Sequence, residues 1–328
     1  MIFVNLITFI NVSLHPCFMK IMVTGGNGFI GHTLVRHLLN EGNDVKVVDI
    51  KPITFRHPNL EFVKKSVLDD LRWDMRDCDM VYHLAAELGV INSDKKPLNT
   101  LSVNIDGTVN VFRCALGTSV KKIVYTSSSE VYGEPREVPL REDSPKSPVS
   151  IYGVSKLTAE MYAYGYVKEY GMDINPVRLF NVYGPGQGFE WVMPIFMQKV
   201  IKNENPIIFG DGSQVRCFTF ISDVVEGIET VRKKGGKGEA YNIANTDKIT
   251  MKELAEKIIS ISGKNLKPLI TGFSAETRTK EREIMVRIPS VDKLKSLGWE
   301  PKVHIDEGIK KTFNWYKDNL GKEELFYC

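Results

Sequence analysis

The feature that most constrains this fold is a glycine-rich turn set between a short apolar run and a helical pattern. Residues 21–23 predict a strand, and apolar residues recur at helical spacing over 30–38. Between them stand Gly25, Gly28 and Gly31. This spacing lets the backbone turn tightly and approach a pyrophosphate at the N-terminus of the helix. The unit therefore predicts a nucleotide-binding βαβ layout.

The alternation of strand and helix continues along the first half of the chain. Further strands are predicted at 45–49, 80–84 and 122–125, with a helix from about 101 to 116. We therefore predict an α/β fold, with a Rossmann-type doubly wound parallel sheet and a smaller C-terminal α/β substrate domain.

Two changes along the chain suggest domain limits. After Pro185 the regular alternation of predicted strands and helices stops, so we predict one domain over 19–184 and a second over 185–328. A strand-like run at 240–243 leaves open a return to the first domain. Residues 1–18 lack an N-terminal Lys or Arg, a cleavage site and the ~20 apolar residues of a membrane span. We predict a non-native extension there, with a weak peripheral anchor as the alternative.

Composition restricts the partners. Hydrophobic residues make up 43% of the 328 and charged residues 25%, which is typical of a soluble globular protein with no membrane-spanning segment. The net charge of +3 is too small to favour nucleic acid. The five cysteines are scattered, with no pair at metal-ligand spacing, so we expect a cytoplasmic protein without a metal site.

Asp49 ends the second predicted strand, about twenty residues beyond the glycines. A carboxylate there can accept hydrogen bonds from an adenosine ribose and would repel a 2′-phosphate, so NAD is favoured over NADP. Lys51 and Arg56 nearby leave that choice open. The alternative is a plain βα turn with a solvated Asp49.

Two Tyr/Lys pairs with four-residue spacing occur in one predicted helix. They are Tyr152–Lys156 and Tyr164–Lys168, and each pair shares a helix face. An ammonium beside a phenol stabilises the phenolate and makes a base. Twelve residues of helix span ~18 Å, so both pairs cannot serve one site. Ser128 favours the first pair, because it ends a predicted parallel strand, where ligands of such sheets bind.

At this point the sequence resembles a family, the extended short-chain dehydrogenase/reductases that act on nucleotide sugars. The resemblance runs from about Lys20 to the C-terminus. The matching motifs, in chain order, are GGNGFIG, Asp49, HLAA at 83–86, VNIDGT at 103–108, YTSSSEVYGE, YGVSK and RLFNVYGPG at 178–186. The resemblance implies a tightly held NAD, a UDP-sugar or related substrate, an NAD-binding domain over 19–184 and a nucleotide-sugar-binding domain over 185–328.

The family pattern assigns roles residue by residue. The catalytic set falls on Ser128, Tyr152 and Lys156, with Lys156 keeping Tyr152 ionised. The implied cofactor contacts are Gly25, Gly28, Phe29, Ile30, Gly31, Asp49, Val67, Leu84, Ala85, Ala86, Asn104, Tyr152 and Lys156. The implied substrate contacts are Ser128, Ser129, Glu130, Asn181, Arg216 and Arg287. The family also suggests a homodimer, for which the helix with Met161 and Tyr162 offers a face.

The resemblance leaves the reaction open. Members that dehydrate the sugar carry Asp-Glu after the catalytic Ser/Thr, whereas this chain has Ser129-Glu130. Glucuronate decarboxylases carry Ser-Glu there and an Arg-x-Pro-Asp/Ser motif that matches Arg287 to Ser290, although Arg287 could instead hold phosphates or pair with Glu283. The YGVSK form is common among epimerases. We therefore predict a UDP-sugar 4-epimerase, with a decarboxylase as the alternative and a dehydratase or a non-catalytic NAD-binding regulator behind it.

Overall fold

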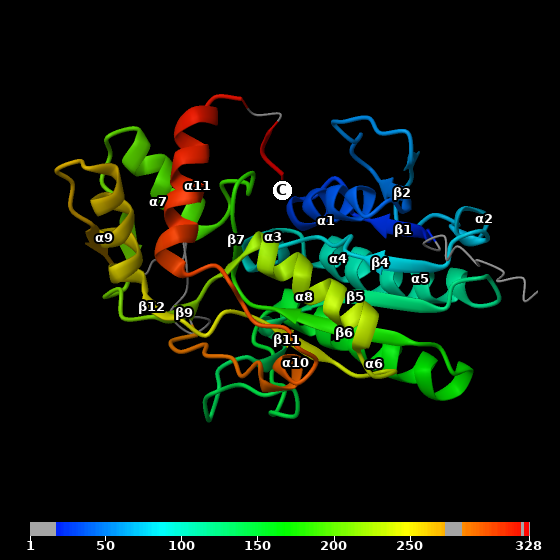
Figure 1. Ribbon diagram of the computed structural model, residues 1–328. Coiled ribbons are helices and arrows are strands. Elements are labelled where there is room, and N and C mark those ends of the chain that lie inside the picture. Colours follow the sequence, from blue (N-terminus) through cyan, green and yellow to red (C-terminus); the bar gives the residue numbers. More distant parts are fainter. Residues whose placement is uncertain (1–17, 273–283, 323–324, 328) are drawn as a thin grey trace, which may run out of the picture.

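The computed structural model describes residues 18–272, 284–322 and 325–327 of the chain. Within this part, seven parallel strands form one sheet (Figure 1): β1 (Lys20–Thr24), β2 (Asp44–Asp49), β3 (Leu60–Lys64), β4 (Met80–His83), β5 (Lys122–Ser128), β6 (Ile174–Leu179) and β11 (Tyr241–Ile243). Their order is β11-β6-β5-β4-β1-β2-β3, so the winding reverses between β1 and β4. The predicted Rossmann-type sheet is confirmed.

Helices cover both faces of this sheet: α1 (Phe29–Asn40), α5 (Gly107–Ala115), α6 (Ile151–Tyr170) and α8 (Ile221–Lys234). Strand β1 is buried on both sides, as expected of a central parallel strand. Ile21 and Val23 pack in one core with residues of α1 and α8, whereas Met22 packs in another with residues of α5 and α6. The alternation of side chains along a strand explains this division.

The predicted helix at 101–116 is interrupted. The chain instead forms α4 (Pro97–Leu101), a π-helical turn at Ser102–Asp106 and then α5. Such π turns widen a helix locally and occur often at functional sites. Here the turn contains Asn104, one of the predicted cofactor contacts.

Helix α6 has well-defined ends. The hydroxyl of Ser150 accepts a hydrogen bond from the Gly153 amide at 3.0 Å, and Gly171 ends the helix at φ +67°. A side-chain cap and a left-handed glycine are the usual stop signals of helices. The first turn of α6 consequently carries Tyr152 close to the end of β5.

A second part of the molecule lies beside the carboxyl edge of the sheet. Its helices are α7 (Val192–Ile201), α9 (Met251–Ser262) and α11 (Ile305–Asn319). Its strands form three pairs: β7 (Val182–Tyr183) with β10 (Thr219–Phe220), β8 (Ile207–Phe209) with β13 (Leu269–Thr271), and β9 (Val215–Cys217) with β12 (Lys248–Thr250). These elements share their own apolar core.

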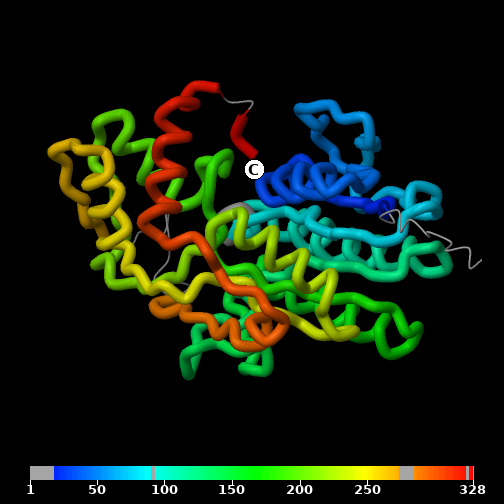
Figure 2. The backbone as a smooth tube through the Cα atoms, viewed as in Figure 1, coloured from blue at the N-terminus to red at the C-terminus, as the bar shows by residue number. Residues whose placement is uncertain are grey.

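Not every residue after 184 belongs to that second part. Helix α8 packs against β5 and β6, and β11 pairs with β6 at the edge of the large sheet. Figure 2 shows the yellow-green backbone of α8 lying along the sheet. No helix in the described ranges is both long and apolar enough to cross a membrane. Of the predicted extension at 1–18, all but Phe18 lies outside the described residues.

Candidate active site

The glycine turn lies at the point where the sheet reverses its winding. Gly25 has φ +70°, and a Cβ atom there would approach the Ala85 amide nitrogen to 2.6 Å. A Cβ on Gly31 would lie 2.1 Å from the Gly25 carbonyl oxygen. Neither position tolerates a side chain, because the helix starts directly against the turn. Phe29 and Ile30 pack toward the core of the second part.

Asp49 lies beside the same turn. One carboxylate oxygen accepts the Asn27 amide at 3.0 Å, and the other accepts the Lys51 amide at 2.9 Å. Each oxygen has a second lone pair, so the carboxylate can also accept ribose hydroxyls. The side-chain oxygen of Asn27 is buried without a hydrogen-bond partner, and buried polar atoms normally have one. The turn therefore fits a ligand that carries hydroxyl and phosphate groups.

The three predicted catalytic residues converge at the carboxyl end of β5. Ser128 is the last residue of that strand, and its hydroxyl lies near enough to the Tyr152 phenol to oppose the rise of its pKa. The Lys156 ammonium donates to the Thr126 carbonyl at 2.8 Å and lies 5.8 Å from the centroid of the Tyr152 ring. All three side chains are buried.

Burial controls the charges of this group. It lowers the pKa of Lys156 to about 7, although the nearby Glu160 carboxylate partly offsets the change. Burial also raises the pKa of Tyr152 well above 10, against the opposing hydrogen bond with Ser128. We predicted from sequence that Lys156 keeps Tyr152 ionised. Burial opposes that ionisation, because the phenolate loses the water that would solvate its charge. The role of Lys156 therefore stays a prediction.

A buried network that sequence reasoning missed supports the catalytic group. Glu160 accepts hydrogen bonds from the Ser127 hydroxyl and from two nitrogens of Arg178, at 3.0 and 2.7 Å. It thereby links α6 to β5 and β6 next to Ser128 and Lys156. Glu160 follows Lys156 by four residues on the same helix face, a spacing that could have indicated it. Arg178 gave no such local signal.

Asn104 joins the loop after β4 to α6. Its side-chain oxygen accepts the Glu87 amide at 2.8 Å, and its amide nitrogen donates to the Ser155 hydroxyl at 3.0 Å. Ser155 in turn donates to the Tyr152 carbonyl at 2.7 Å. Asn104 therefore fixes the first turn of α6, whatever else it contacts.

The remaining predicted cofactor contacts border the glycine turn and the next strand. The Leu84 and Ala85 amides donate to the carbonyl and the hydroxyl of Thr24, at 3.1 and 3.3 Å, and Ala86 follows them in the loop. Val67 is buried, and its carbonyl accepts the Asn110 side chain at 2.8 Å. The structure thus lines the end of the sheet with these backbone segments.

Arg287 lies against the residues that follow Ser128. Its guanidinium donates to the Glu130 carboxylate at 2.7 Å and to the Ser129 hydroxyl at 3.5 Å. Arg287 is 5% exposed and its Nε atom has no hydrogen-bond partner. The pairing with Glu283 considered from sequence involves a residue outside the described ranges. Glu130 and Arg287, which are 157 positions apart, form a part-buried ion pair beside Ser128.

The two other predicted substrate contacts lie close by, Asn181 just before β7 and Arg216 in β9. The Asn181 side chain donates to the Cys217 carbonyl at 3.3 Å. The Arg216 guanidinium donates to the Val215 carbonyl at 3.0 Å, and the Arg287 amide donates to that same carbonyl at 3.1 Å. Strand β9 therefore brings Asn181, Arg216 and Arg287 into one region.

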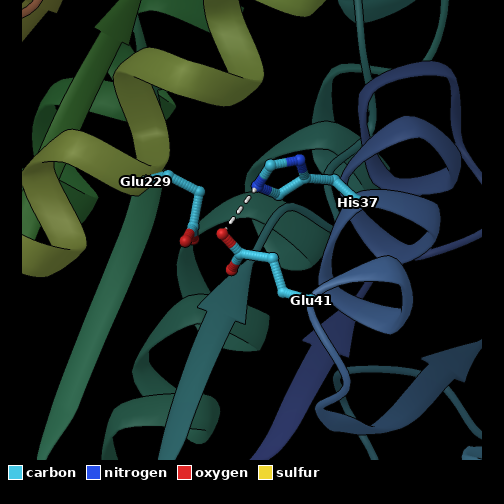
Figure 3. A group of neighbouring side chains, drawn as sticks. All are labelled: His37, Glu41 and Glu229. Carbon is cyan, nitrogen blue, oxygen red and sulfur yellow. Dashed lines mark ion pairs between the residues drawn. The ribbon is translucent and has the colours of Figure 1, made fainter.

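One cluster away from this site has metal-ligand chemistry. His37, Glu41 and Glu229 approach one another between α1 and α8 (Figure 3), and the first two form an ion pair at 3.6 Å. Glu229 is already paired with Arg232 at 2.7 Å, and Glu41 with Lys233 at 3.1 Å. Their charges are compensated by the protein, so we assign no metal there.

Known proteins with related sequences and structures have several activities. A putative UDP-glucose 4-epimerase of Methanocaldococcus jannaschii is 35% identical over 91% of this chain and 99% of its own. A UDP-N-acetyl-alpha-D-glucosaminuronate decarboxylase of Bacillus cytotoxicus is 31% identical over 91% and 98%. A dTDP-glucose 4,6-dehydratase of Streptomyces venezuelae, solved with NAD and TYD bound, superposes with a TM-score of 0.86 at 29% identity, over 94% of this chain and 100% of that one.

The family assignment is clearer than the activity. Residues 21–244, more than half of the chain, match the NAD dependent epimerase/dehydratase family. The cofactor of this family is NAD, as we predicted from the glycine turn and Asp49. The sequence match, the parallel sheet and the related proteins agree, and the chain belongs to the NAD-dependent epimerase/dehydratase family of extended short-chain dehydrogenase/reductases.

Proposed function

We propose that this protein is a nucleotide-sugar 4-epimerase that acts on a UDP-sugar through a 4-keto intermediate. The observation that supports it is the buried group of Ser128, Tyr152 and Lys156 at the carboxyl end of β5. Epimerisation requires no further acid or base from the other residues, because the keto sugar only has to rotate in the site before hydride returns to its opposite face. The similarity to the putative UDP-glucose 4-epimerase of Methanocaldococcus jannaschii supports the same reaction.

In this mechanism Tyr152, once ionised against the cost of its burial, takes the proton from the sugar 4-hydroxyl and later returns it to the same oxygen. Ser128 hydrogen-bonds that oxygen and stabilises the developing charge. Lys156, with a pKa of about 7, supplies positive charge next to the phenol in its protonated fraction. Bound NAD supplies the acceptor and donor of the hydride at the sugar carbon.

We further propose that one part of the molecule binds NAD and the other binds the nucleotide sugar. The NAD-binding domain consists of 19–184 together with α8 and β11, which pack on its sheet, and the nucleotide-sugar-binding domain consists of the remainder of 185–328. Arg216 suits the pyrophosphate of the substrate, because a planar guanidinium binds phosphate oxygens in pairs. Asn181, next to it, is the proposed contact to the sugar nucleotide.

We also propose a homodimer formed through α6. Val154, Met161 and Tyr162 are exposed on one face of this helix, at positions i, i+7 and i+8. Gly165 continues that face, and a Cβ atom there would meet nothing within 4 Å. A glycine inside a helix costs about 1 kcal/mol relative to alanine, and no contact among the described residues requires one here. A second α6 packed closely against this face would account for it.

A decarboxylase is the second candidate, and the Glu130–Arg287 pair favours it. A 4-keto uronate is a β-keto acid that loses carbon dioxide readily. The enzyme then has to hold the carboxylate and protonate the enolate that remains. Arg287, with an unpartnered buried Nε, and Glu130 have the chemistry for these two tasks. A dehydratase is disfavoured, because Ser129 replaces the expected acid.

One experiment separates the two candidates. UDP-glucose, UDP-N-acetylglucosamine and UDP-glucuronate are offered without added reductant, and products are followed by NMR together with carbon dioxide release. We expect a mixture of 4-epimers and no gas. Glu130→Ala should keep at least a tenth of the epimerase activity, a loss below about 1.4 kcal/mol, because epimerisation needs no acid or base at the neighbouring carbon.

The matched control is Glu137→Ala, because Glu137 is exposed, and this variant should have the activity of the wild type. Release of carbon dioxide from UDP-glucuronate, abolished by Glu130→Ala but not by Glu137→Ala, would replace the epimerase assignment with the decarboxylase.

A further inference from the structure

The C-terminal segment 325–327 lies across the junction between the two parts of the molecule. Figures 1 and 2 show the red end of the chain beside the blue helix α1. Its backbone pairs with the loop that follows β7. The Tyr327 amide donates to the Gly186 carbonyl at 2.8 Å, and the Gly188 amide donates to the Tyr327 carbonyl at 2.9 Å. These bonds fix the segment to the first residues of the second part.

Aromatic packing anchors the segment on the same side. The Phe326 ring lies 4.7 Å from that of Phe189 and 5.3 Å from that of Trp315, centroid to centroid. Tyr316 contacts Phe326 as well, and its hydroxyl donates to the Gln187 carbonyl. The segment is therefore held by α11 and by the loop after β7 together.

The Tyr327 side chain reaches the opposite side of the junction. Its ring stacks on His32 of α1 at 4.3 Å, and its hydroxyl lies 3.0 Å from the His32 Nε2 atom. Arg36 also donates to that nitrogen, at 3.2 Å. Because a guanidinium can only donate, Nε2 is the acceptor of the Arg36 bond, and a hydrogen bond from the Tyr327 hydroxyl shares the same lone pair. Burial, with the charge of Arg36, lowers the pKa of His32 to about 4, so the ring stays neutral near pH 7.

His32 extends the contact to the loop that follows Asp49. The Phe55 ring meets His32 edge-on at 5.2 Å, and the Arg36 guanidinium lies 4.3 Å from the Phe55 centroid. His32 is 8% exposed. The segment thus contacts the helix that begins at the glycine turn, and through His32 the loop beside the proposed ribose acid.

The loop after β7 has a residue suited to this contact. Gly186 has φ +87°, and a Cβ atom there would lie 3.1 Å from the Tyr327 ring. Contacts this short require the neighbour to shift, and the backbone angle disfavours other residues. A glycine at 186 therefore both turns the chain and leaves room for Tyr327.

We propose that Tyr327 and His32 are positioning residues that retain bound NAD, by fastening the glycine-turn helix α1 to the second part of the molecule. Release of NAD from the glycine turn and from Asp49 requires these segments to separate or loosen, and opening steps of this kind often set release rates. This inference rests on NAD binding and not on the proposed sugar reaction.

The test measures the dissociation of NAD from the full-length holoprotein. Protein loaded with radiolabelled NAD is diluted into excess unlabelled NAD, and the loss of bound label is followed. Tyr327→Ala should release NAD at least ten times faster than the wild type. Tyr327→Phe keeps the stacked ring and should lie in between. Tyr170→Ala, at an exposed tyrosine of α6, is the control and should match the wild type.

A second variant separates positioning from general loosening. His32→Ala should accelerate release to a similar extent, and the double variant Tyr327→Ala/His32→Ala should be no faster than the faster single variant, because both remove the same contact. A rate of NAD release from Tyr327→Ala within twofold of the wild-type rate would overturn the proposal. It would also be overturned if the double variant released NAD faster than either single variant, by the product of their effects. If Tyr327→Ala fails to fold, Tyr327→Phe and His32→Ala decide. Since no sugar is present, failure here leaves the epimerase proposal untouched.

Discussion

Helix α6 carries two Tyr/Lys pairs with the same spacing in opposite surroundings. At its start, Tyr152 and Lys156 are 9% and 2% exposed, and both face the end of β5. Twelve residues later, Tyr164 is 61% exposed, with the Lys168 ammonium 5.5 Å from its ring centroid. Local spacing is thus identical, and only the surroundings differ. Chemistry at such a pair depends on the strand end and the burial, not on the motif.

The largest expected difference along α6 is in the free energy of unfolding, and it concerns the buried Glu160–Arg178 ion pair next to the first Tyr/Lys pair. Glu160→Gln leaves the Arg178 guanidinium buried without its counter-charge, so we expect a loss of roughly 3–5 kcal/mol in the free energy of unfolding. Glu169→Gln, at an exposed position of the same helix, should change it by less than about 0.5 kcal/mol. Urea unfolding measures both. Equal effects would mean that the Glu160 network does not support this end of the helix.

The second prediction compares the phenols. Tyr152→Phe should reduce turnover by ~100-fold or more, the usual scale for a lost general base, while bound NAD is retained. Tyr164→Phe should leave turnover within about twofold, because its ring is in solvent. Steady-state kinetics on the substrate identified by NMR measures the difference. Similar losses in the two variants would indicate a folding defect and remove the catalytic assignment.

The third prediction uses the two lysines and pH. The folded-state pKa of Lys156 is lowered from 10.5 to about 7. Between pH 7 and 9 the unfolded chain therefore binds more protons than the folded one, and stability rises with pH. This residue should contribute about 2 kcal/mol to the rise. Lys156→Met removes that contribution, whereas Lys168→Met keeps it. Urea unfolding of the cofactor-free protein at pH 7 and pH 9 measures this rise in the free energy of unfolding. A rise in Lys156→Met equal to that of the wild type contradicts the assigned burial effect.

The smallest expected effect on the protomer concerns the outer face of α6. Met161→Lys introduces a charge at a position 56% exposed in the single chain, so its free energy of unfolding should change by less than about 0.5 kcal/mol. In the proposed homodimer this charge would be buried, and sedimentation should then give the monomer mass. Trp73→Lys, at another exposed apolar side chain, should leave the mass unchanged. A wild-type protein that already sediments as a monomer contradicts the dimer.

Features that depend on residues close together in the sequence were predicted correctly, whereas features that depend on contacts between distant segments were missed. Strands at 21–23, 45–49 and 122–125 were predicted from local apolar runs, and the structure contains them. The helix at 101–116 was predicted without its π turn, because the contacts of Asn104 with Glu87 and Ser155 are made between segments far apart in sequence. Periodicity reports burial on a helix face and carries no information about such side-chain contacts.

The site shows the same limit. Ser128, Tyr152 and Lys156 were indicated by a strand end and a helix start, and the structure brings them together. The cost of ionising Tyr152 was missed, because the sequence indicates a neighbouring charge but not the desolvation of the phenol, which raises its pKa.

The sequence by itself determined the strand–helix rhythm, the glycine turn and the family to which the chain belongs, because each depends on residues close together in the chain. The tertiary structure decided which Tyr/Lys pair is buried, that Arg287 pairs with Glu130 and that Tyr327 stacks on His32. The last two contacts join residues 157 and 295 positions apart. Only folding of the whole chain brings such partners within hydrogen-bond distance, so no local pattern could indicate them.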